Sequence, residues 1–232
     1  MKKLVKGVSE FQKSTFPNNQ EFFQELANKQ EPEVMFLTCC DSRVDPSLIT
    51  ETDPGDLFIH RNVGNIVPPH ALVTGGVTAS IEFAVAVLGV KYIIVCGHTD
   101  CGAMKGAMNP DLAKSLPYVN NWLSHSAAAL ARVSAKHDEL SIEEHLHEMT
   151  EENVLLQLRH LETHPSVATS MAKGNLELHG WIYDIGTGGV NCFDPNQGKF
   201  VSVQDRYAHL HTTDWKETKP DRRFKQVRKL CP

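Results

Sequence analysis

Two short segments of the chain carry side chains of the kinds that bind metals. The sequence reads CCDSR at residues 39–43 and HTDC at residues 98–101. Thiolate and imidazole are ligands that the borderline-soft Zn2+ ion takes readily, and three protein ligands with one open position are typical of catalytic zinc sites. A single His-x-x-Cys pair is as often two ordinary core residues, so the prediction depends on both segments meeting. We predict that they meet, and that Cys39, His98 and Cys101 hold one Zn2+.

The alternation of side chains in an extended segment distinguishes the two adjacent cysteines. Cys39, Asp41 and Arg43 then point to one side and Cys40 points to the other, which favours Cys39 as the ligand. A neighbouring Arg43 keeps Asp41 ionised, so that its carboxylate can accept a hydrogen bond from a metal-bound water. The simpler alternative is a surface ion pair at the start of a helix that Asp45 caps.

The segments around the two motifs predict an α/β fold. Residues 34–38 and 92–96 are apolar and are expected to be buried strands, so each motif follows a strand at the edge where open α/β sheets form binding crevices. Strands and helices alternate along the chain, which predicts a single domain with a mainly parallel central β-sheet flanked by helices. The other strands expected are 57–60, 176–185, 190–193 and 200–203. A helix is expected at 77–88, closed by Gly89, and the region 117–173 is helical in pattern, with a capping box at Ser141 and Glu144.

The start of the chain predicts a helical arm. Leu4, Val8 and Phe11 recur at helical spacing, and no continuous apolar segment of a signal peptide is present. Asn18 or Asn19 is expected to cap a second short helix. An arm of this kind needs another surface to cover its apolar side, and a partner subunit is the natural source. The predicted parts are the N-terminal arm at 1–30, the zinc-binding domain at 31–211 and a basic C-terminal tail at 212–232.

The composition excludes several classes of partner. Of the 232 residues 41% are hydrophobic and 22% are charged, with a formal net charge of -5. This balance gives no field that attracts nucleic acid, and no segment approaches the roughly 18 consecutive apolar residues of a membrane span. Six irregularly spaced cysteines favour a reducing compartment over a disulfide framework. We therefore expect a cytoplasmic protein with a small-molecule substrate, no nucleic-acid partner and no membrane partner. Bland positions are expected for Cys192 in the core, for Cys231 in the tail, and for His145, His147, His160 and His164 on the surface.

The motifs taken together resemble the signatures of one enzyme family. CCDSRV at 39–44, RNV at 61–63 and GHTDCG at 97–102 are similar to those of the β-class carbonic anhydrases, and the similarity continues through LHGWIYD at 178–184. The resemblance implies reversible hydration of carbon dioxide to hydrogencarbonate and a proton, by attack of zinc-bound hydroxide on CO2. It also implies a parallel sheet and a dimer or tetramer with exchanged N-terminal arms.

The same resemblance implies roles for particular residues. Asp41 and Arg43 are the expected catalytic groups, and Gly102 lies against the substrate. Asp41 is a zinc ligand only in a possible closed state of the site. Two positions depart from the family pattern: Cys40 stands where serine is usual, and Asp53 stands where many plant-type members have a glutamine that helps to hold substrate.

Some members of the family also carry an inhibitory hydrogencarbonate pocket made of a tryptophan, an arginine and a tyrosine. Arg61 and Tyr183 match two of these groups. Phe36 occupies the tryptophan position, and a phenyl ring has no N–H with which to bind an anion. We therefore predict that this pocket does not work here.

Three other functions are compatible with parts of the sequence. A relative that acts on CS2 or COS would carry the same zinc ligands. A zinc-stabilised binding or scaffold protein would not need Asp41 beside Arg43. A redox protein using Cys39 and Cys40 would have to form a strained disulfide between adjacent residues.

Overall fold

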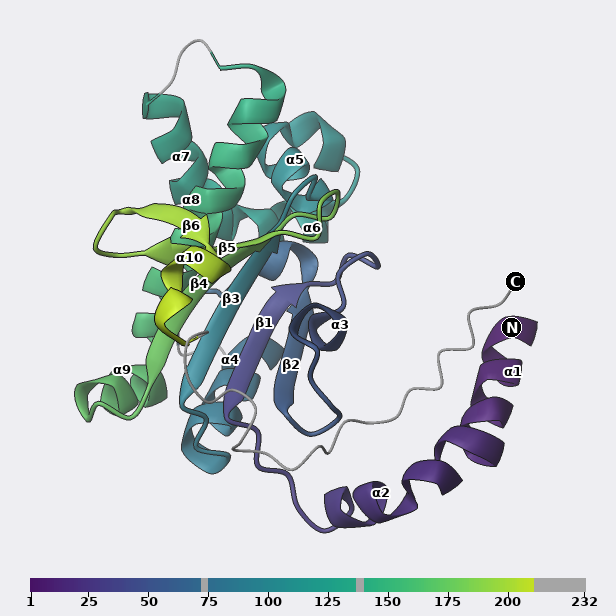
Figure 1. Ribbon diagram of the computed structural model, residues 1–232. Helices are drawn as coiled ribbons and strands as arrows, with labels where there is room; N and C mark the ends of the chain where they lie inside the picture. The colour runs from purple at the N-terminus through teal and green to yellow at the C-terminus, as the bar shows by residue number, and fades with distance from the viewer. Residues whose placement is uncertain (72–74, 137–139, 211–232) are drawn as a thin grey trace. The chain divides into compact units, whose positions relative to one another are not determined.

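The computed structural model describes residues 1–71, 75–136 and 140–210 (Figure 1). The chain divides into two units, one of which spans Pro32–Ala208 while the other takes in Met1–Glu31. The predicted basic tail and Cys231 lie outside the described residues.

The larger unit is built on one sheet of six strands in the order β2-β1-β3-β4-β5-β6. The neighbouring strands β2, β1, β3 and β4 run parallel, whereas β5 and β6 extend the sheet as antiparallel strands. This confirms the predicted α/β fold with a mainly parallel sheet. The strands are β1 (Val34–Cys39), β2 (Leu57–Asn62), β3 (Tyr92–His98), β4 (Glu177–Tyr183), β5 (Val190–Asp194) and β6 (Lys199–Ser202).

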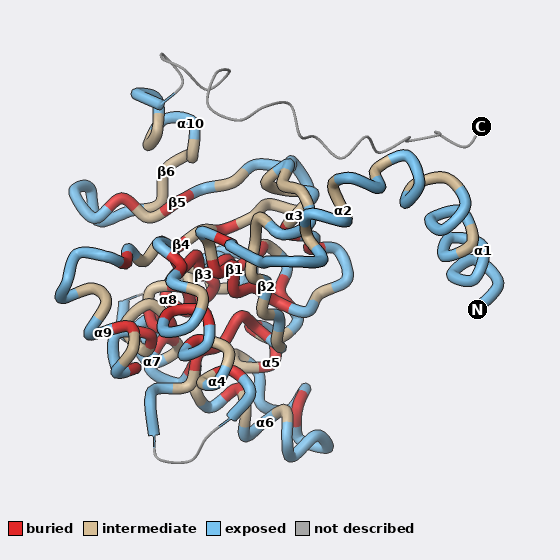
Figure 2. The backbone as a smooth tube through the Cα atoms, turned by 90° about the horizontal axis from the view of Figure 1, so that it is seen from below, coloured by how far each residue is buried: buried red, intermediate tan, exposed pale blue. Residues whose placement is uncertain are grey.

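Helices flank the sheet, and those from α4 to α9 gather on one side of it (Figure 2). The long helix α8 lies against β3 and β4. It packs closely because Gly97 and Gly180 have no side chain, and a Cβ at either would lie within 3.0 Å of the Val154 side chain. The helices are α3 (Pro46–Thr50), α4 (Gly76–Glu82), α5 (Gly102–Met108), α6 (Pro117–Leu123), α7 (Ala127–Lys136), α8 (Ile142–Glu162), α9 (Pro165–Ala172) and α10 (Val203–Arg206), besides α1 (Lys2–Glu10) and α2 (Gln20–Leu26) of the arm.

The two faces of the sheet bury different clusters. Met35, Leu37, Ile93 and Val95 point toward the helices and join the main core. The alternate residues form a second cluster on the opposite face, in which the ring of Phe36 meets that of Trp181 edge-on at 6.1 Å between centroids. The buried members of this second cluster are Phe36, Ile94 and Cys96. Strand alternation thus sorts one sequence into two cores.

Two of the predicted helix caps are present and one is not. The Asp45 carboxylate accepts from the Leu48 N–H at 3.3 Å at the start of α3, and Ser141 with Glu144 forms the capping box of α8. Helix α2 does begin after Asn19, but the Asn19 amide donates to the Thr15 carbonyl instead of capping. The cap prediction was wrong because the chain is already helical before Asn19, which leaves a carbonyl within reach and little need for a cap.

The arm buries none of the residues from Met1 to Glu31. The arm contains a cluster of aromatic rings, in which Phe16 stacks on Phe23 at 5.1 Å between centroids and Phe11 meets both edge-on. Leu4 and Val8 remain exposed on α1. The arm is therefore a short helical segment with uncovered apolar side chains.

Two histidines predicted to lie on the surface lie inside. His164 is 1% exposed and donates from Nε2 to the Pro68 carbonyl at 3.0 Å, and His160 is half-buried and donates from Nδ1 to the Val67 carbonyl at 2.7 Å. The prediction failed because both imidazoles bond to backbone carbonyls far away in the sequence, at Val67 and Pro68, which lie in no described helix or strand.

The five cysteines in the described part of the chain form no disulfide, and Cys192 is buried as predicted. No helix among the described residues combines the length and apolar content that a bilayer crossing needs.

Candidate metal centre

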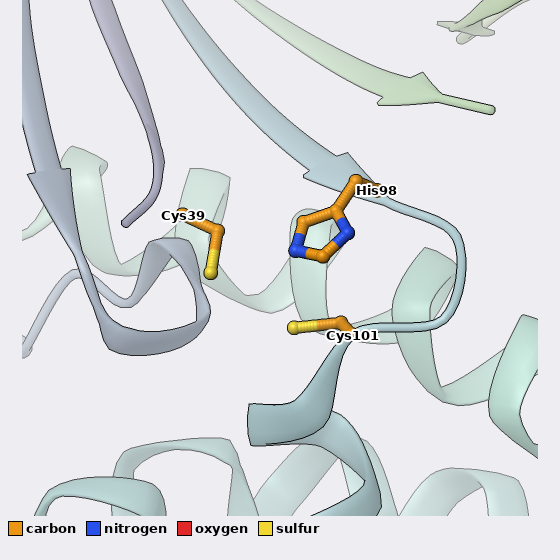
Figure 3. A group of neighbouring side chains, drawn as sticks. All are labelled: Cys39, His98 and Cys101. Carbon is orange, nitrogen blue, oxygen red and sulfur yellow. The ribbon is translucent and has the colours of Figure 1, made fainter. Parts of the chain in front are cut away.

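Three predicted ligands meet at the ends of two neighbouring strands. Cys39 is the last residue of β1 and His98 the last of β3, while Cys101 directly precedes α5. Because β1 and β3 are adjacent and parallel, both strands end at the same edge of the sheet. The ligand atoms of the three residues lie within 4.8 Å of one another, and all three residues are buried. Figure 3 shows their side chains turned toward a common point.

The histidine is held with one nitrogen facing that point. Its Nδ1 lies 2.8 Å from the Thr99 carbonyl. Since a carbonyl only accepts, Nδ1 carries the hydrogen, and in the neutral ring Nε2 offers a lone pair. Nε2 is buried and has no hydrogen-bond partner among the described residues. A buried nitrogen without a partner beside two sulfur atoms fits a bound cation, and the ligand set fits Zn2+.

The pKa shifts of the two thiols also fit a bound cation. Hydrogen bonding with Cys101 is the main reason that the pKa of Cys39 is lowered from its usual range, although burial opposes the shift. The same contact, together with burial, raises the pKa of Cys101. The contact therefore favours a thiolate at Cys39 and a thiol at Cys101. Burial lowers the pKa of His98, but the Cys39 sulfur and the Thr99 carbonyl outweigh it and the pKa is raised. The pocket thus concentrates negative charge that a divalent cation would balance.

Two oppositely charged side chains, those of Asp41 and Arg43, lie beside the cluster. Arg43 grips Asp41 through two bonds, from Nε to Oδ1 at 3.0 Å and from Nη2 to Oδ2 at 2.8 Å. This contact is the largest of the effects that hold the pKa of Asp41 well below its usual range. Asp41 Oδ2 lies 3.9 Å from His98 Nε2. The ionised carboxylate therefore faces the pocket.

The backbone that presents Asp41 is a turn and not the extended segment assumed from the sequence. Strand β1 ends at Cys39, and the Val44 N–H donates to the Asp41 carbonyl at 3.0 Å. Arg61 braces this turn by donating to the carbonyls of Cys39 and Asp41 at 3.1 and 2.7 Å. Cys40 is exposed, and it is not one of the three residues whose ligand atoms lie together. Asp41 and Arg43 do lie beside the three ligands, but the alternation of side chains on which this was predicted ends with strand β1 at Cys39.

Two further charged residues join the pair, and the sequence alone did not single them out. Arg43 Nη1 donates to Asp100 Oδ2 at 3.0 Å, and Lys105 binds the other oxygen of Asp100. Asp100 has a φ of 59°, in the left-handed region. Its position between His98 and Cys101 was the available signal.

The remaining predicted positions are placed as follows. Gly102 begins α5, and a Cβ built there would meet nothing within 4 Å. Open space therefore exists next to the cluster. Asp53 lies in the loop before β2, where its backbone N–H donates to Asp56 Oδ2 at 2.9 Å. The Gly64 amide, which the sequence did not single out, donates to Cys39 Sγ at 3.4 Å.

Comparisons with known proteins agree on the family. The family model described as carbonic anhydrase matches residues 34–190. A carbonic anhydrase of Pseudomonas aeruginosa is 44% identical over 205 residues, which cover 88% of this chain and 93% of that protein.

Solved structures agree as well. The β-carbonic anhydrase CcaA is 40% identical and superimposes with a TM-score of 0.85 over 87% of this chain and 98% of its own. A structure reported among two tetrameric β-carbonic anhydrases of Sordaria macrospora is 29% identical, with a TM-score of 0.69 over 85% of this chain and 96% of its own. The chain belongs to the carbonic anhydrase family, and within it to the β class.

Proposed function

We propose that this protein catalyses the zinc-dependent, reversible hydration of carbon dioxide to hydrogencarbonate and a proton. The observation that carries the proposal is the cluster of Cys39, His98 and Cys101 with the ionised Asp41 beside it. Three ligands leave one coordination position for a reactant. A purely structural zinc site closes all four positions with protein ligands.

A zinc ion at this site would lower the pKa of water enough to supply hydroxide near neutral pH. The protein's own residues then have to orient that nucleophile. Asp41 serves as a hydrogen-bond acceptor, because its carboxylate is ionised and one oxygen faces the pocket. An acceptor fixed in this way would restrain the hydrogen of the attacking hydroxide and so orient its lone pair toward CO2.

Arg43 is assigned the task of keeping Asp41 out of the metal's open position. Its two bonds to Asp41 would both break if the carboxylate turned fully toward the ligands. Ligation by Asp41 would give a closed, inactive site. We assign the space next to Gly102 to CO2, because a Cβ there would meet no atom within 4 Å outside its chain neighbours and the backbone of its own helix.

We also propose that the protein works as a dimer or tetramer in the cytoplasm. The Sordaria macrospora relative is described as tetrameric, and the arm of this chain has exposed apolar side chains that an assembly would cover.

The decisive experiment is metal analysis of the purified protein together with rate measurements on CO2, CS2 and COS. We expect about one zinc per chain and rapid CO2 hydration that chelation abolishes and zinc restores. Faster turnover of CS2 or COS than of CO2 would replace the proposed substrate and leave the metal centre standing. Zinc without turnover of any of the three would favour a scaffold role.

A further inference from the structure

We propose that Trp122 is a positioning residue of the metal centre, acting on the Cys39 sulfur through a single peptide group. The Trp122 indole N–H donates to the Val63 carbonyl at 2.8 Å. The N–H of that same peptide group belongs to Gly64, and it donates to Cys39 Sγ at 3.4 Å. The inference rests on the proposed zinc site.

The two hydrogen bonds strengthen each other because they share one peptide dipole. A donor on the carbonyl oxygen draws electron density from the N–H at the other side of the group, and hydrogen bonds in such chains polarise one another. The better donor then takes more charge from the thiolate. Two thiolates reduce the positive charge of a zinc ion and hence its power to acidify water. The Trp122 bond opposes that reduction at one of the two sulfurs.

The peptide group is held firmly enough to transmit this effect. Gly64 has a φ of +79°, and a Cβ there would lie 2.9 Å from the Ala103 Cβ and 3.1 Å from the Met104 Cε. Those two residues belong to α5, directly after the ligand Cys101. Gly64 therefore lies closely between the two segments that carry the sulfur ligands.

A buried amide fixes the other side of Gly64. Asn153 of α8, 1% exposed, donates from Nδ2 to the Gly64 carbonyl at 3.1 Å. Its own carbonyl oxygen accepts from Ser126 and from Gln157, each at 2.8 Å, so the Asn153 amide cannot reverse without losing both bonds. Trp122 and Asn153 thus hold consecutive carbonyls of the segment that presents the N–H to Cys39.

Trp122 also packs against the core, so a test must separate its N–H from its ring. Two replacements remove the N–H: Trp122→Phe, and replacement of Trp122 by benzothienylalanine, which keeps the bicyclic shape. The matched control is Trp181→Phe. The Trp181 indole nitrogen is buried and has no hydrogen-bond partner among the described residues, so this change removes an N–H that the centre does not use.

The experiment loads the full-length proteins with Co2+ and records the cobalt content, the sulfur-to-cobalt charge-transfer band, and the pH profile of CO2 hydration by the zinc forms. In both Trp122 replacements we expect full cobalt loading, a band at lower energy because the thiolate is a better electron donor, and a rising limb displaced by about 0.3 pH units to higher pH, a twofold change. Trp181→Phe should leave the cobalt loading, the band and the rising limb unchanged.

Full loading with band and limb at their wild-type positions in the benzothienylalanine protein would overturn the inference alone. An equal displacement in Trp181→Phe would overturn it too, since the effect would then reflect loosening of the fold. A wild-type protein that takes up no cobalt would overturn the proposed metal site and this inference with it.

Discussion

Each of the three predicted ligands is expected to be needed to hold the metal. Cys39, His98 and Cys101 supply all the ligand atoms of the proposed site, and an open site of three ligands has none to spare. We predict that alanine at any one of them lowers zinc content from about one per chain to less than about a tenth. Cys40→Ala is the matched control, because Cys40 is adjacent but exposed. Elemental analysis after dialysis decides the question, and full zinc occupancy in Cys39→Ala would remove Cys39 from the ligand set.

Asp41 acts without holding the metal in the open site. We predict that Asp41→Asn and Arg43→Ala retain zinc but lose about 10–100-fold in kcat. Because Arg43 holds the pKa of Asp41 well below its usual range, Asp41 stays ionised from mildly acidic pH upward, and a bound cation would lower that pKa further. Activity should rise toward alkaline pH, and this rise cannot be the titration of Asp41. The rising limb should therefore persist in Asp41→Asn beneath a lower plateau; stopped-flow rates from pH 6 to 9 that show no limb in the variant would contradict this.

Phe36 bears on inhibition by the product. Its ring packs on Trp181 and offers no donor to an anion, and Arg61 already donates to two carbonyls. A desolvated anion with an unfilled acceptor costs roughly 1–3 kcal/mol. We predict that excess hydrogencarbonate does not inhibit cooperatively, as judged by the Hill coefficient of inhibition. Cooperative inhibition that Tyr183→Phe abolishes would show that the pocket works without a tryptophan.

At the scale of elements, hydrophobic pattern and capping chemistry predicted the strands that carry the ligands and the start of α8. They did so because a buried parallel strand is apolar throughout and a capping box is a local contact. The contacts that the sequence did not reveal are long-range: the Val67 and Pro68 carbonyls are satisfied by His160 and His164, more than ninety positions away. No local pattern encodes a partner of that kind.

These histidines predict an acid-sensitive fold. Burial lowers the pKa of both His160 and His164. The unfolded chain then binds more protons than the folded one as the pH falls through the ordinary value of about 6.5. Their contribution to stability is present above that pH and is lost below it.

We predict that His164→Gln, which retains a side-chain N–H for the Pro68 carbonyl, makes the decrease in Tm between pH 7.5 and pH 5.5 smaller by a few degrees. The control is His147→Gln, because the His147 side chain is 55% exposed. Calorimetry at both pH values provides the comparison. Equal slopes for wild type and His164→Gln would show that the loop does not depend on a neutral imidazole.

On the scale of the whole molecule, the sequence predicted the family and the main sheet because a few motif residues and the strand pattern are local features. It did not predict how the 63–68 segment is held, since that depends on side chains from α6 and α8. The metal centre therefore depends on the fold more widely than its motifs suggest. Arg61 shows the same: it lies in a recognised motif, yet its contacts to the carbonyls of Cys39 and Asp41 appear only when β1 and β2 are side by side.

The exposed apolar side chains of the arm predict contacts with other copies of the chain. Since Leu4 and Val8 are exposed on α1 and no residue from 1 to 31 is buried, the apolar side of the arm lacks the cover that stabilises a surface helix. We predict that Val8→Asp raises the dissociation constant of the assembly at least about tenfold, or about 1.4 kcal/mol, because it places a charge in an apolar interface. Lys6→Asp is the control, as it changes the charge of the same exposed helix at a polar position. Sedimentation velocity over a range of concentrations should show smaller species for Val8→Asp alone. Identical profiles for both variants and the wild type would mean that the apolar side of α1 takes no part in assembly.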